Sequence, residues 1–144
     1  MTPRKGGTTV PMTAHEVKTR AEHARGHLRA AELVATFGDD LDSSAVANVI
    51  ASLAVLSGTA AGDAICGHEL GVRSNSGNHA DAVKLLATSA TGSKAASHLS
   101  DLIAIKGEAH YSPANITTAR ANDAVKHARR LLESMEKSLR GRLS

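Results

Sequence analysis

An arginine and a histidine frame the segment Arg73-Ser-Asn-Ser-Gly-Asn-His79, with five small polar residues between them. We expect a loop leading into a helix near His79, whose first backbone N–H groups have no acceptor within the helix. Those groups and the Arg73 guanidinium would bind a phosphate, with Asn75 and Asn78 as further binding residues. A histidine with an ordinary pKa of about 6.5 can exchange a proton near neutral pH, which makes His79 a candidate catalytic group. The same spacing also fits a solvated loop whose histidine faces water.

A second group of chemically useful residues lies at Lys106-Gly-Glu-Ala-His110-Tyr111. Lys106 and His110 are four residues apart, so they share one face of a helix. A fixed cation beside a histidine lowers the pKa of that histidine and favours the neutral base, and the Tyr111 hydroxyl would add a binding group. The alternative is that His110 and Tyr111 pack and cap the last turn before Pro113.

Asp63 stands out because it lies within a long apolar segment, beside Ala60, Ala61, Ala64 and Ile65. A buried carboxylate is costly unless it is paired. The sequence offers three candidate partners for Asp63, which are Arg73, Lys106 and His110. Both a structural salt bridge and the orientation of a catalytic histidine fit this position.

Metal and cofactor motifs are missing from the sequence. His23 and His27 are four residues apart, with His15 upstream, and could share a metal ion, but no acidic or thiol partner stands at a suitable spacing. A polar surface face explains them better. Cys66 is the single cysteine, and there is neither a Gly-rich phosphate loop nor an H-E-x-x-H motif. The sequence therefore predicts no metal ion and no cofactor.

The periodicity of apolar residues predicts an all-α bundle of four long helices and one short helix. Glycines at 58 and 62 leave one side of the second helix smooth enough for a close helix approach. Residues 1–12 are predicted to be a disordered lead-in, and residues 13–144 a single domain. The first expected helix covers 13–37 and has a capping box at Thr13 and Glu16. The second runs from a cap at Asp42 or Ser43 to Leu70, and a short third helix covers 79–90. The fourth is capped by Ser93 and ends at Tyr111, and the last runs from Asn115 or Thr117 to the end.

Composition narrows the function classes. The chain has 144 residues, 42% of them hydrophobic but only 1% aromatic, which argues against nucleic-acid domains that stack bases on aromatic rings. A net charge of +3 is compatible with a phosphate-bearing partner. The sequence has a single cysteine and no secretory signal, which predicts a cytoplasmic protein. It has no apolar run of about 20 residues, which predicts that it does not span a membrane.

Three segments together resemble the HEPN-domain proteins, in particular small stand-alone actinobacterial members. They are 58–66 (GTAAGDAIC), 70–79 (LGVRSNSGNH) and 106–111 (KGEAHY). The family is a helical bundle that commonly dimerises, and many members are metal-independent RNases that act as toxins or in defence. Its signature is an arginine, a polar residue, a few variable residues and a histidine.

The resemblance assigns Arg73 and His79 as the main catalytic pair, with Ser74 where the family usually has Asn, Asp or His. Lys106 and His110 form a looser copy of the signature, with Lys for Arg. The implied function is a homodimeric endoribonuclease whose composite site acts on RNA, with a cognate antitoxin as a further partner. The alternative is a non-catalytic HEPN-like module that binds a protein or a nucleotide.

Overall fold

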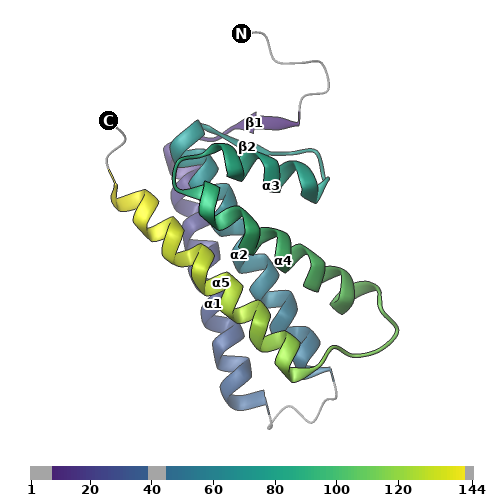
Figure 1. Cartoon of the computed structure of the whole chain (residues 1–144). Coiled ribbons are helices and arrows are strands. Elements are labelled where there is room, and N and C mark those ends of the chain that lie inside the picture. Colours follow the sequence, from purple (N-terminus) through teal and green to yellow (C-terminus); the bar gives the residue numbers. More distant parts are fainter. Residues whose placement is uncertain (1–7, 39–44, 142–144) are drawn as a thin grey trace.

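The computed structural model describes residues 8–38 and 45–141. It is a helical bundle with four long helices and one short helix, as the sequence predicts, plus a two-stranded sheet (Figure 1). The elements in chain order are β1 (Thr9–Pro11), α1 (Ala14–Phe37), α2 (Val46–Leu70), β2 (Val72–Ser74), α3 (His79–Thr88), α4 (Gly92–Tyr111) and α5 (Thr118–Arg140).

Most helix boundaries follow from local capping chemistry. The predicted capping box is present, since the Thr13 side chain accepts from the backbone N–H of Glu16 and the Glu16 carboxylate accepts from that of Thr13. Gly71 ends α2 in the left-handed conformation, with φ of 75°. The prediction of Ser93 as a cap is wrong, because α4 already begins at Gly92. Asp42 and Ser43, the expected caps of α2, lie outside the described residues.

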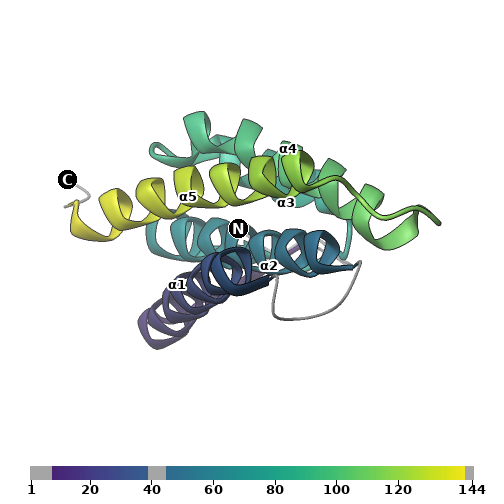
Figure 2. The same cartoon turned by 90° about the horizontal axis from the view of Figure 1, so that it is seen from below.

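Helix α2 forms the centre of the bundle and packs against α1, α4 and α5 (Figures 1 and 2). Alanines supply much of its buried surface, and this allows the neighbouring helices to approach closely. Within the described part of the chain, α2 alone is long and apolar enough to cross a membrane, but 67% of that apolar window is buried inside the protein. Burial to that extent fits the core helix of a bundle.

The sheet corrects the prediction that residues 1–12 are disordered. Strand β1 pairs antiparallel with β2, with Val10 opposite Arg73, and the next residue but one, Met12, is buried. Residues 1–7 lie outside the described residues. This pairing could not be predicted from the sequence, because each strand has only three residues and so shows no extended alternating pattern. The pairing holds the backbone of Arg73 in place between α2 and α3.

Candidate functional site

Two arginines and one aspartate form the charged centre of the candidate site. Asp63 on α2 is 18% exposed, and its Oδ2 accepts a hydrogen bond from the Arg20 guanidinium on α1 at 3.0 Å. Arg73 on β2 lies close enough to attract the same carboxylate. All three side chains line a surface pocket of about 620 Å³, which also contains His15. Burial raises the pKa of Asp63, and the two arginines oppose that rise.

Of the three partners that the sequence suggested for Asp63, Arg73 interacts with its carboxylate, and the direct ion pair is made by a residue outside that set. Arg20, which was not considered, makes the direct ion pair, whereas neither Lys106 nor His110 is recorded as a partner. The observed helix ends explain this pairing. Arg20 lies 17 residues before the end of α1 and Asp63 lies 17 residues after the start of α2, so antiparallel neighbours place them at the same height.

His79 and Lys106 form the second part of the site. The ammonium group of Lys106 on α4 donates to Nε2 of His79, the first residue of α3, at 2.8 Å. Burial lowers the pKa of His79, and the Lys106 charge lowers it further. His79 is consequently a neutral imidazole near pH 7, with its own proton on Nδ1. The sequence assigned this effect of Lys106 to His110, but the structure directs it to His79.

A narrow crevice joins the two parts. Asp63 lines both the arginine pocket and this crevice, which Ser74 and His79 line as well. The crevice holds about 20 Å³, enough for one water molecule. The structure thus brings Arg73, Asp63, His79 and Lys106 to one region, with the Asp63 carboxylate between the arginines and the histidine.

His110 and Tyr111 lie one turn farther along α4. The imidazole Nε2 of His110 is 2.9 Å from the Ser52 hydroxyl on α2. Tyr111 is 79% exposed, and its ring contacts the edge of the His110 ring. Tyr111 is therefore not packed into the core. Ser52 was missed from the sequence, where nothing distinguishes it from other serines.

The two asparagines of the loop have structural contacts. The Asn78 side chain accepts from the backbone N–H of Ala80 and thereby caps α3. The N–H of Asp81 is also satisfied, by the backbone oxygen of Asn78. The backbone N–H of the exposed Asn75 donates to the Thr8 oxygen, which extends the sheet. These bonds occupy N–H groups that the sequence reasoning assigned to a phosphate, so the charged side chains remain as the anion-binding groups.

No group of three or more His, Cys, Asp or Glu side chains is arranged to hold a metal ion within residues 8–38 and 45–141. The ability of the site to bind and react thus rests on two arginines, a lysine and a neutral imidazole. Comparisons with protein-family models, with curated proteins and with solved structures returned no match.

Proposed function

We propose that this protein is a metal-independent endoribonuclease that binds an RNA phosphodiester with Arg73 and Lys106 and activates it with His79. The observation that carries the proposal is the contact between His79 and Lys106. A neutral imidazole beside a cation combines a general base with a phosphate ligand. Arg20 and Arg73 line the neighbouring pocket together with the carboxylates of Glu16 and Asp63.

The proposed reaction uses the RNA itself as nucleophile. His79 accepts the proton of a 2′-hydroxyl, and the 2′-oxygen forms a bond to the adjacent phosphorus. The bond from phosphorus to the 5′-oxygen breaks, and that oxygen takes a proton from a second histidine. The products are a 2′,3′-cyclic phosphate and a 5′-hydroxyl. For this step Lys106 must turn from His79 Nε2 toward the phosphate, which its four-carbon stem permits.

A second copy of the chain would complete the site in this proposal. His110 is exposed, and Val49 and Leu56 lie on α2 within one turn of its partner Ser52. These two apolar side chains are 44% and 50% exposed. An apolar surface beside a candidate catalytic histidine is compatible with a homodimer whose two sites share residues.

The test is cleavage of a fluorescent single-stranded RNA in excess EDTA. We expect wild-type protein to cleave it and to leave a cyclic phosphate, and we expect no cleavage of the same RNA with 2′-O-methyl groups. His79→Ala should lose the activity and His110→Ala should reduce it. His98→Ala, a histidine on the opposite side of α4, is the matched control and should remain active. Equal cleavage by wild type and His79→Ala would disprove the role of His79.

The pH profile provides a second, more specific readout. Lys106→Met removes the charge that helps to lower the pKa of His79. The acidic limb of the kcat/KM profile should therefore move to higher pH in this variant, in addition to any loss in rate. An acidic limb that stays in place would show that His79 is not the base.

One observation favours a second function, which is a non-catalytic module that binds an anionic nucleotide or a protein partner. Asp63, which pairs with Arg20, lines both the pocket of Arg73 and the crevice of His79, and Lys106 occupies the lone pair that a base needs. In that case wild-type protein binds RNA or nucleotide, with weaker binding by Arg73→Ala, but cleaves nothing. Induced expression would then be harmless for wild type, His79→Ala and His110→Ala alike, whereas a toxin would slow growth only with its histidines intact.

A further inference from the structure

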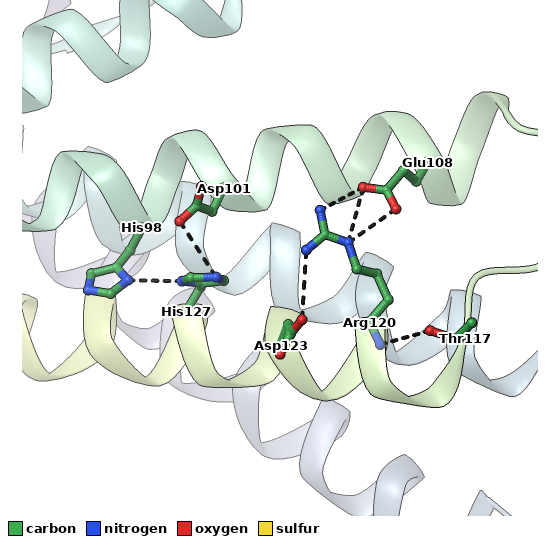
Figure 3. Close-up of polar contacts among 7 residues, drawn as sticks. All are labelled: His98, Asp101, Glu108, Thr117, Arg120, Asp123 and His127. Atoms are coloured by element: carbon green, nitrogen blue, oxygen red, sulfur yellow. Dashed lines mark hydrogen bonds and ion pairs between the residues drawn. The ribbon is translucent and has the colours of Figure 1, made fainter.

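A pair of histidines on the other side of α4 plays no part in the proposed RNA site. Nδ1 of His98 on α4 and Nδ1 of His127 on α5 are 2.9 Å apart, and Figure 3 shows the two rings facing each other across the helix interface. The ring centroids are separated by 5.2 Å. Two imidazole nitrogens at this distance must have a proton or a metal ion between them, since two bare lone pairs would repel.

The other nitrogen of His127 has a carboxylate neighbour. Asp101, one turn after His98 on α4, places its Oδ2 at 3.6 Å from His127 Nε2 (Figure 3). At 3.6 Å this separation is longer than a direct hydrogen bond, but the carboxylate lies on the Nε2 side of the ring and attracts a proton there rather than on Nδ1. Histidines that bind metals usually direct their second N–H to a carboxylate in this manner.

We propose that His98 and His127 form a two-histidine site for a late first-row divalent transition-metal ion, with Asp101 as the carboxylate that orients His127. Nitrogen ligands about 2.05 Å from one metal ion lie about 2.9 Å apart at right angles and about 3.3 Å apart at the tetrahedral angle. The observed 2.9 Å fits the right angle, which is the geometry of Ni²⁺ and Cu²⁺. Water fills the remaining positions, and the ion joins α4 to α5.

Other charged groups surround the pair without blocking it. The adjacent groove is lined, together with His98, by four cationic and two acidic side chains, which are Lys94 on α4 and Arg130, Glu133, Glu136, Lys137 and Arg140 on α5. Arg130 and Glu133 are 3.6 Å apart, so their charges largely cancel. The third helix at this interface, α2, presents Gly58 toward apolar leucines of α4 and α5 and adds no charge.

The experiment is thermal unfolding of untagged protein with Ni²⁺. His23 and His27 also lie four residues apart on α1, so His23→Asn serves as the background to remove that competing pair. We expect the Tm of this background protein to rise with the logarithm of Ni²⁺ concentration at pH 7.5, and Mg²⁺ to have no effect. Introducing His98→Phe or His127→Phe should abolish the rise, and Asp101→Asn should weaken Ni²⁺ affinity about tenfold or more.

A spectroscopic measurement covers the case in which a phenylalanine variant unfolds. Cu²⁺ added to the background protein should give an electron paramagnetic resonance spectrum with two coupled nitrogens at pH 7.5. A Ni²⁺ response that persists in His98→Phe, or no response together with a Cu²⁺ spectrum free of nitrogen coupling, would overturn the proposal. Neither outcome depends on RNA cleavage.

Discussion

Gly58 and Gly62 lie one turn apart on α2, and replacing each by alanine should change the stability of the protein in opposite directions. A Cβ atom on Gly58 would lie 2.3 Å from Leu102 Cδ1 and 3.0 Å from Leu131 Cδ1, and both leucines are fully buried. A Cβ atom on Gly62 would meet Leu99 at 3.5 Å, which is ordinary contact. Gly58→Ala should therefore force the core apart, whereas Gly62→Ala should fit.

The magnitudes follow from two opposing effects. Alanine is favoured over glycine within a helix by about 0.8–1 kcal/mol, and this gain applies at both positions. Overpacking a filled core costs about 1–3 kcal/mol, and this applies at Gly58 alone. We expect Gly62→Ala to stabilise the protein by about 1 kcal/mol, and Gly58→Ala to lie about 1–3 kcal/mol below it.

Urea unfolding followed by circular dichroism measures this difference directly, and for a domain of this size each kcal/mol corresponds to about 2–4 °C in Tm. Gly26→Ala on α1, where a Cβ would have no neighbour within 4 Å, is the control for helix propensity alone. Equal stability of the Gly58→Ala and Gly62→Ala variants would refute the close approach of Leu102 on α4 and Leu131 on α5 to α2.

Three further outcomes follow from the ionisable side chains. Burial raises the pKa of Asp63, so its carboxyl holds a proton more tightly in the folded state than in the unfolded state. Relative to Asp63→Asn, wild type should lose stability as pH rises above the ordinary aspartate pKa of 3.8. A gain in stability would mean that the attraction of the two arginines outweighs burial. Cys66 is 3% exposed, and burial raises the pKa of its thiol to about 12. The thiol should therefore resist alkylation at pH 8 until urea unfolds the protein. Rapid alkylation of Cys66 in the folded protein would contradict its burial. Glu108→Gln breaks an exposed ion pair with Arg120 (Figure 3). It should lower the free energy of unfolding, measured in urea, by less than about 1 kcal/mol. A larger loss would show that the pair is shielded from water.

Local chemistry was sufficient to predict the helices from the sequence. Apolar spacing, the Thr13 capping box, Gly71 and the break at Pro113 are read from neighbours within a few residues, and the helices begin and end close to the expected positions. The fold class followed for the same reason, because alanine-rich helices with one apolar face have few ways to bury it other than a bundle.

Contacts between distant residues required the folded chain. The pairs Arg20–Asp63, Lys106–His79 and Ser52–His110 depend on the rotation and height of each helix against its neighbours, and a shift of one residue turns a side chain by about 100°. The sequence thus supplied the list of chemically capable residues in the Arg73–His79 segment and at Lys106. Their partners were decided by packing, because many alternative pairings of flexible charged side chains satisfy the same sequence pattern and only one satisfies the buried core.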